Sequence, residues 1–231
     1  MAVRVPKAEL PSELSEKMVM RFGAVPEPVE VMWNNPGVAE SNLEFSGKVG
    51  AWDAVDGSLK VFAHMAVAAQ VGCGWCVDVG YFQALSHDLD LAKASQVPCW
   101  RESEVFTPLE RDVLEYAEAM TSTPTTVTDE LSAGLLEQLG PAALVELTTF
   151  IAFTNMATRA NTAHGITSQG FSDGCEIPLA RRPRNDRGPV RRPSQPAVHG
   201  RLRDARIGGR RGRRAPGVVA AVGRRRPVAG A

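Results

Sequence analysis

The sequence lacks the features that are typical of membrane proteins, of secreted proteins and of β-sheet proteins. No apolar run approaches the roughly 20 residues that a membrane-spanning helix needs, and the opening MAVRVPKAELPSE has no apolar signal core. No stretch shows sustained alternation of apolar and polar residues, which is the pattern of a half-buried strand. These absences predict an all-α protein of the cytoplasm that does not enter a membrane.

Cysteine is also scarce, with four in 231 residues. In a reducing compartment, so few cysteines indicate redox or metal chemistry more often than a disulfide framework. Cys73 and Cys76 form a Cys-x-x-Cys pair, whereas Cys99 and Cys175 stand apart. A structural zinc ion needs four ligands, and the remaining Cys and His residues offer no second ligand pair at the usual spacing. The pattern therefore favours a redox pair over a zinc site, and we expect no metal and no cofactor.

The net charge of zero conceals a sharp split. Residues 1–180 carry 10 Lys and Arg against 24 Asp and Glu, whereas residues 181–231 carry 16 Arg, no Lys and two Asp. The second segment has no aromatic residue and is rich in Gly and Pro, a composition that predicts a disordered tail. It could bind nucleic acid, lie on the acidic body, or be unselected, out-of-frame sequence from a GC-rich gene. We favour the last interpretation, and the lack of stacking aromatics argues against nucleic acid.

Apolar periodicity, capping residues and breaks predict helices throughout residues 1–180. A Thr-Pro-Leu-Glu capping box and several Gly and Pro positions mark where these helices begin and end. The expected helices are Ser12–Arg21, a new start at Pro26 to Pro28, Pro36–Val49, Leu59–Val71, a helix from Gly74, a short one from Asp88 or Asp90 to Gln96, one from Thr107 to Thr121, one from Thr128 to Gly140, and the longest from Pro141 to His164.

The rest of the chain is organised around the cysteine pair. The helix before it, Leu59–Val71, is apolar nearly all round and should be buried, and Gly72 then breaks it. If the next helix begins at Gly74, its free first-turn N–H groups and its dipole stabilise a thiolate. One sulfur can then attack an oxidant while the other closes a disulfide. The alternative is two inert buried cysteines, since free Cys is commonly buried.

Three segments together carry a family resemblance. The stretch SLKVFAHMAVAAQVG precedes Cys73-x-x-Cys76, FTPLERDVLEYAEAMT follows it, and LVELTTFIAFTNMATRANTAHG closes the body. Over roughly residues 10–180 the chain resembles the carboxymuconolactone decarboxylase/alkylhydroperoxidase D (AhpD-like) superfamily. The resemblance implies an AhpD-like all-helical bundle that assembles into a homo-oligomer, often a trimer or hexamer.

The resemblance also implies an activity. In the peroxidase branch the second cysteine attacks a hydroperoxide and the first is its partner, roles that would fall on Cys76 and Cys73. An external dithiol would restore the pair after each turnover. The decarboxylase branch generally lacks the cysteine pair, so the pair favours the redox branch.

The chain departs from the peroxidase pattern at two positions. The pattern has a His where this chain has Gly80 and a Glu where it has Val61, so two members of the proton relay are missing. His64 and Asp78 are the nearest candidates to replace them, with Tyr81 a weaker one. The alternatives are that His64 is a satisfied polar group on an apolar helix and that Asp78 is a solvated or capping carboxylate.

Two further functions stay open at this point. One is a catalytically degenerate helical oligomer or interaction module, and the other is a cofactor-free decarboxylase or lactone-acting enzyme. Trp75, between the cysteines, either lines an apolar substrate channel or simply packs. Asn155 and Arg159 on the last helix are expected to tie helices or subunits together rather than bind substrate.

Overall fold

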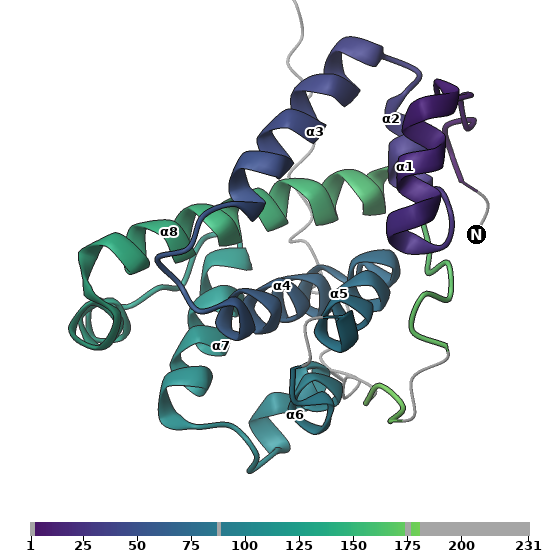
Figure 1. Ribbon diagram of the computed structural model, residues 1–231. Helices are drawn as coiled ribbons and strands as arrows, with labels where there is room; N and C mark the ends of the chain where they lie inside the picture. The colour runs from purple at the N-terminus through teal and green to yellow at the C-terminus, as the bar shows by residue number, and fades with distance from the viewer. Residues whose placement is uncertain (1–2, 87–88, 174–176, 181–231) are drawn as a thin grey trace, which may run out of the picture. The chain divides into compact units, whose positions relative to one another are not determined.

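A computed structural model describes residues 3–86, 89–173 and 177–180 (Figure 1). Within these residues the chain is helical and contains no strand, as the sequence predicts. The predicted tail, residues 181–231, lies outside the described residues.

The helices follow one another along the chain with short connections. In order they are α1 Ser12–Phe22, α2 Glu27–Met32, α3 Pro36–Gly50, α4 Gly57–Val71, α5 Gly74–Ser86, α6 Leu91–Gln96, the 3-10 helix η1 Val97–Glu102, α7 Pro108–Thr121 and α8 Asp129–His164. The predicted bounds agree closely with these. The sequence missed η1, and the two helices expected after Thr128 are present as two segments of α8 that meet at a kink at Gly140, where the backbone is not helical.

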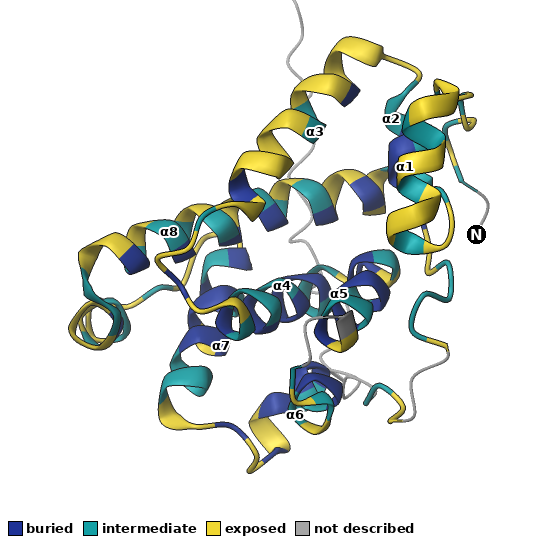
Figure 2. Cartoon of the chain, in the orientation of Figure 1, coloured by how far each residue is buried: buried dark blue, intermediate teal, exposed yellow. Residues whose placement is uncertain are grey.

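Helix α4 is the centre of the core. It packs against α5, α7 and α8, and Figure 2 shows it dark along most of its length because its residues are buried. Phe62 and Met65 are almost fully enclosed. A helix that is apolar on all sides hides its surface only when others surround it, so its sequence dictates this central place.

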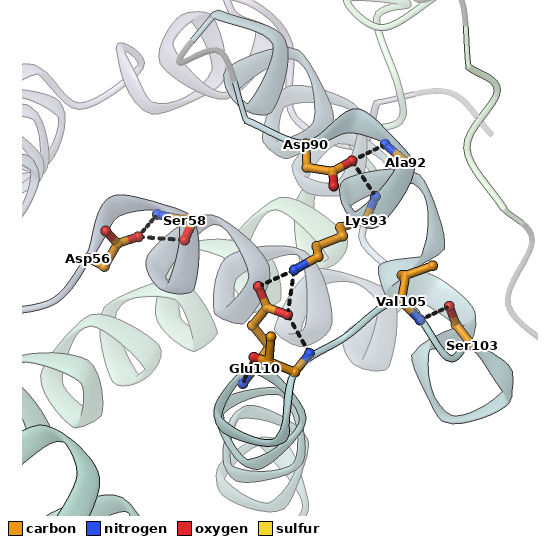
Figure 3. A network of polar contacts seen from close by, with 9 residues as sticks. Asp56, Ser58, Asp90, Ala92, Lys93, Ser103, Val105 and Glu110 are labelled. Carbon is orange, nitrogen blue, oxygen red and sulfur yellow. Dashed lines mark hydrogen bonds and ion pairs between the residues drawn. The ribbon is translucent and has the colours of Figure 1, made fainter.

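Side-chain caps fix where the neighbouring helices begin (Figure 3). Asp56 caps α4 and Asp90 caps α6, each by accepting backbone N–H groups of the first turn. Thr107 and Glu110 form the predicted capping box of α7. Glu110 also accepts from Lys93 Nζ at 2.8 Å, which ties α6 to α7. These contacts hold α6 and α7 in place beside α4.

Helix α8 runs across α4 and α7. It is kinked at Gly140, whose backbone has φ 77° and ψ 167°, immediately before Pro141. This helix of 36 residues is long and apolar enough to cross a membrane by length and composition alone. Core helices of soluble proteins also meet that criterion. Asn155 Nδ2 donates to Thr121 Oγ1 at 3.0 Å, and Arg159 donates to the Thr121 carbonyl at 2.7 Å. The prediction that this Asn and Arg tie helices together is confirmed.

Candidate redox site

The turn between α4 and α5 places the cysteine pair. Gly72 adopts a left-handed conformation with φ 81°, which a side chain would strain. The backbone N–H groups of Gly72 and Cys73 both donate to the Ala68 carbonyl at 2.9 Å, closing α4. Because α5 begins at Gly74, Cys73 occupies the N-cap position and Cys76 the third helical position.

The two thiols form one unit. Cys73 Sγ and Cys76 Sγ lie 2.9 Å apart as a thiol pair, and each residue is 1 % exposed. The Cys76 N–H also donates to Cys73 Sγ at 3.4 Å. This is the bond that an N-cap Ser or Asp normally accepts from the third residue of a helix. The Cys73 sulfur therefore substitutes for the usual capping oxygen.

The two thiols differ in pKa because their surroundings differ. The hydrogen bond from the Cys76 thiol, helped by first-turn N–H groups, lowers the pKa of Cys73 to about 7 in spite of burial. The pKa of Cys76 is raised by its hydrogen bond with Cys73, by burial and by the charge on Cys73. The Asn161 amide opposes this rise only in part. The structure thus favours Cys73 as the thiolate, the reverse of the order that the family resemblance implies. The reason is that first-turn amides converge on the capping side chain, whereas Cys76 contributes its own amide to that cap.

His64 approaches the pair from α4. Its Nε2 lies 3.0 Å from the Cys76 carbonyl oxygen. A carbonyl only accepts, so Nε2 carries a proton, and burial lowers the pKa of the ring and keeps it neutral. This hydrogen bond goes to the backbone beside the thiol, not to sulfur. His64 therefore buttresses the first turn of α5 in this structure.

Gly80 permits that approach. A Cβ added there would lie 2.8 Å from Met65 Cγ and 2.9 Å from His64 Cδ2. The imidazole of His64 thus fills space that a side chain at position 80 would occupy. Helices α4 and α5 therefore approach each other closely at Gly80. The family's histidine is absent from α5, but an imidazole from α4 lies beside the same position.

Asp78 is buried, and its hydrogen bonds in the described structure go to a loop rather than to the sulfurs. Its 4 % exposure excludes a solvated carboxylate. Burial alone would raise its pKa, but hydrogen bonds from the loop after α8 outweigh that and lower it. The six donors are Ser168 Oγ and the N–H groups of Gln169, Gly170 and Phe171 on Oδ2, with Ser172 N–H and Oγ on Oδ1. Asp78 organises this loop, and its contacts within the described residues lead away from the sulfurs.

The loop in turn covers the start of α5. The Ser168 backbone nitrogen lies 3.6 Å from where a Cβ on Gly74 would be. Gln169 Oε1 accepts from the Trp75 indole N–H and from the Glu27 backbone N–H, both at 2.7 Å. The loop therefore joins the cysteine turn to α2. Sequence reasoning missed Gln169, because no local pattern links it to a residue so far away.

Trp75 packs against a neighbouring aromatic cluster. Its ring meets Phe171 edge to face, with centroids 6.2 Å apart. Phe22 and Phe82 also contact Phe171, at 6.3 Å and 5.9 Å. An apolar cluster thus lies next to the thiol pair, and Trp75 packs within it.

Asn161 is the second site residue that sequence reasoning missed. It comes from α8, is 7 % exposed, and its Nδ2 lies 3.3 Å from Cys76 Sγ. A signal was present, because the buried stripe of α8 continues at helical spacing through Ile151, Thr154, Thr158 and Asn161. The stripe changes from apolar to polar where it approaches the cysteines. A buried amide at such a position indicates a polar partner on the facing helix.

Metal binding has no support from the described residues. Among them, no three His, Cys, Asp or Glu side chains gather closely enough to hold an ion. The arrangement can instead carry out two-electron dithiol chemistry, because two sulfurs touch and one has a lowered pKa.

Comparisons with known proteins agree on the fold. No protein-family profile matches the sequence. An uncharacterized protein of Escherichia coli K12, YnjA, is 37 % identical over 115 residues, which is 50 % of this chain and 62 % of that protein. The chain thus matches about three fifths of the length of this curated relative.

Solved structures extend the comparison. The debrominase Bmp8 matches with a TM-score of 0.65 and 19 % identity over 72 % of this chain and 93 % of the enzyme. A peroxidase-related protein from Silicibacter sp. TM1040 gives 0.62 and 16 % over 72 % and 90 %. An Agrobacterium tumefaciens protein, related by its description to the antioxidant defence protein AhpD, gives 0.56 and 20 % over 59 % and 94 %. The chain has the AhpD-like helical fold, as its motifs indicated, and at these identities the likeness establishes the fold alone.

Proposed function

We propose that this protein is a dithiol–disulfide oxidoreductase that reduces hydroperoxides with Cys73 and Cys76. One observation carries the proposal: the two sulfurs lie 2.9 Å apart at the start of a helix, and the Cys76 N–H of its first turn donates to the Cys73 sulfur. A thiol with a pKa of about 7 is roughly half ionised at neutral pH. An unperturbed thiol, with a pKa of about 8.5, is ionised to only about 3 % there.

The reaction would proceed in two steps. The Cys73 thiolate attacks one peroxide oxygen, the O–O bond breaks, and the alkoxide leaves as an alcohol after taking up a proton, which gives a sulfenic acid. Cys76 sulfur then attacks the sulfenic sulfur, loses its proton, and releases the hydroxyl as water. The products are one alcohol, one water and one disulfide. An external dithiol returns two electrons and two protons to the pair by thiol–disulfide exchange.

The site differs from the peroxidase pattern in how it handles protons. No side chain extends from Gly80, and Val61 packs as a partly buried apolar residue against the core. His64 lies over Gly80 but hydrogen-bonds a carbonyl. We therefore expect a slow peroxidase whose thiolate depends on the helix cap rather than on a base.

The mass of the purified protein provides the test. Treatment of the reduced protein with one equivalent of an organic hydroperoxide should remove two hydrogen atoms and should protect both cysteines from a thiol-blocking reagent. Cys99, half-buried and with its pKa raised by burial, serves as the internal control and should stay blockable. If Cys73 and Cys76 remain as reactive towards the reagent after peroxide as before, the proposal is wrong.

A second substrate class follows from the comparisons. A variant of Bmp8 with a cysteine replaced by alanine was solved with 2,3,4-tribromopyrrole and matches this chain with a TM-score of 0.67. Removing bromine reductively from an aromatic ring takes two electrons and one proton, which a dithiol supplies as it forms a disulfide, with bromide and a proton released. The aromatic cluster at Phe171 suits a flat apolar substrate. Bromide release from a bromopyrrole, measured beside hydroperoxide consumption, distinguishes the two.

We also propose a homo-oligomer, as the family resemblance implies. Exposed apolar side chains on α3 and α8 support it, namely Val38, Phe45, Val145 and Met156. Such side chains are energetically costly to leave in water, and a second copy can cover them. Light scattering that shows a monomer at micromolar concentration would exclude this assembly. We also propose the cytoplasm as the compartment, because an external dithiol that restores the pair is kept reduced there.

A further inference from the structure

Asn161 is placed where the second step of the reaction needs help. Its Nδ2 group points at Cys76 Sγ from α8, 3.3 Å away, and the residue is almost fully buried. The Cys73 sulfur, by contrast, receives the helix-cap amide. Each sulfur thus has its own N–H donor, one from the backbone and one from a side chain.

The two donors act at different moments. In the reduced pair the two thiols share one hydrogen bond, and the lowered pKa of Cys73 together with the raised pKa of Cys76 makes Cys76 the protonated partner. Once Cys73 has become a sulfenic acid, Cys76 must lose that proton and attack. A thiolate forming in a buried place needs a donor to replace water. The Asn161 amide is the side-chain donor that the described structure aims at this sulfur.

We propose that Asn161 is a catalytic residue of the resolving step, because it stabilises Cys76 as a thiolate while the disulfide forms. This inference rests on the proposed dithiol chemistry and assigns a part of it. In the step, the Cys76 S–H bond breaks, an S–S bond forms to Cys73, and the sulfenic S–O bond breaks to release water. Asn161 neither gains nor loses a proton, since an amide only donates its hydrogen bond.

The test uses two variants of Asn161 and a matched control. Asn161→Ala removes the amide, and Asn161→Leu removes it while keeping the branched shape and the number of side-chain heavy atoms, so that a packing defect is separated from a lost donor. Asn155→Ala deletes the same side chain from the same helix, where it contacts Thr121 and Ile151 instead of a thiol. Circular dichroism confirms that each variant is folded.

The first measurement is the sulfenic acid that forms after a hydroperoxide pulse, captured with a dimedone-type reagent and assigned by mass spectrometry. Both Asn161 variants should accumulate about tenfold more sulfenic acid at Cys73 than wild type, as expected for one lost hydrogen bond to a charged group, and some should proceed to sulfinic acid. Asn155→Ala should match wild type. Equal trapping in wild type and both Asn161 variants would overturn the inference while leaving the peroxidase proposal intact.

The second measurement needs no peroxide. In a Cys73→Ser background Cys76 titrates without its partner thiol, and the pH dependence of its alkylation gives its pKa directly. Adding Asn161→Leu should raise that pKa by about one unit, because the thiolate loses a donor. An unchanged pKa would contradict the assignment, since a purely structural Asn161 would not set it. A wild-type protein that does not react with hydroperoxide at all would instead refute the proposed function.

Discussion

Helix α5 begins with two buried ionisable centres that satisfy their charges in opposite ways. The thiol pair at Cys73 and Cys76 is bonded within itself, to the first turn of α5 and to the Asn161 amide of α8. Asp78, two residues on, accepts six hydrogen bonds from a single loop. A carboxylate with every lone pair engaged is a structural anchor, whereas a sulfur with one shared proton can still react. The number and source of the hydrogen-bond donors therefore distinguish a reactive site from a structural one.

The largest effect should come from breaking the pair itself. Cys73→Ser should abolish hydroperoxide consumption, because it removes the ionised sulfur, while Cys76→Ser should permit one stoichiometric oxidation that stops at the sulfenic acid. The measurement is peroxide remaining per protein at fixed time, with product masses. The opposite result, in which Cys76→Ser is inert and Cys73→Ser reacts once, would restore the order implied by the family resemblance.

Removing the anchor should affect stability more than chemistry. Asp78→Ala leaves Ser168, Ser172 and three further backbone amides without their acceptor, and we expect a loss of about 3 kcal/mol in the free energy of unfolding. Urea denaturation measures it. A variant as stable as wild type but without peroxide reduction would show that Asp78 belongs to the reaction after all.

The dependence of stability on pH in the acid range tests the structural role of Asp78 further. The pKa of Asp78 is lowered in the fold, so its stabilising contribution is present above the unfolded value of about 3.9 and is lost as pH falls through the folded value. Asp78→Asn should therefore be less stable than wild type near neutral pH, and the difference should shrink below about pH 4. Thermal melts across that range test it.

Crowding the contact between α4 and α5 should have an intermediate effect. In Gly80→Ala the new methyl meets Met65 and His64 at under 3 Å. Overpacking costs about 1–3 kcal/mol, against about 1 kcal/mol gained in helix propensity, so a net loss of about 1 kcal/mol is expected. Gly74→Ala, whose methyl would meet only ordinary van der Waals contact, is the control. Equal unfolding midpoints for the two variants would contradict the close approach.

The smallest effect on thiol chemistry should come from His64→Ala. The ring is neutral and bonded to the Cys76 carbonyl, so the midpoint of thiol alkylation against pH should shift by less than about half a unit. His64 should also affect how stability depends on pH, because burial lowers the pKa of His64 below its unfolded value of about 6.5. The unfolded chain thus binds the extra proton, and wild type should lose stability as pH falls through 6.5 while the variant should not. A large shift in the alkylation midpoint would make His64 the activating base.

Local patterns predicted most of the fold and one part of the site. The helix start at Asp90, the Thr107 box and the break at Gly72 depend on residues close in sequence, and the structure confirms them. The cysteine spacing gave the redox pair for the same reason.

The rest of the site depends on contacts between distant segments. Asn161 reaches Cys76 across 85 residues of chain, and the partners of Asp78 lie about 90 residues away. The ionisation order of the two thiols was also beyond the sequence, because it depends on the contacts that each sulfur makes with the other thiol, with the Cys76 N–H and with Asn161.

The central claim is that Cys73, as the N-cap, ionises before Cys76. Reduced wild-type protein can be alkylated briefly with iodoacetamide across pH 5 to pH 10, and the label on each cysteine can be quantified by peptide mass spectrometry. The account predicts that Cys73 is labelled with a midpoint near pH 7, while Cys76 is still unlabelled at that pH. Labelling of Cys76 at lower pH than Cys73, or of both only near pH 8.5, would contradict it.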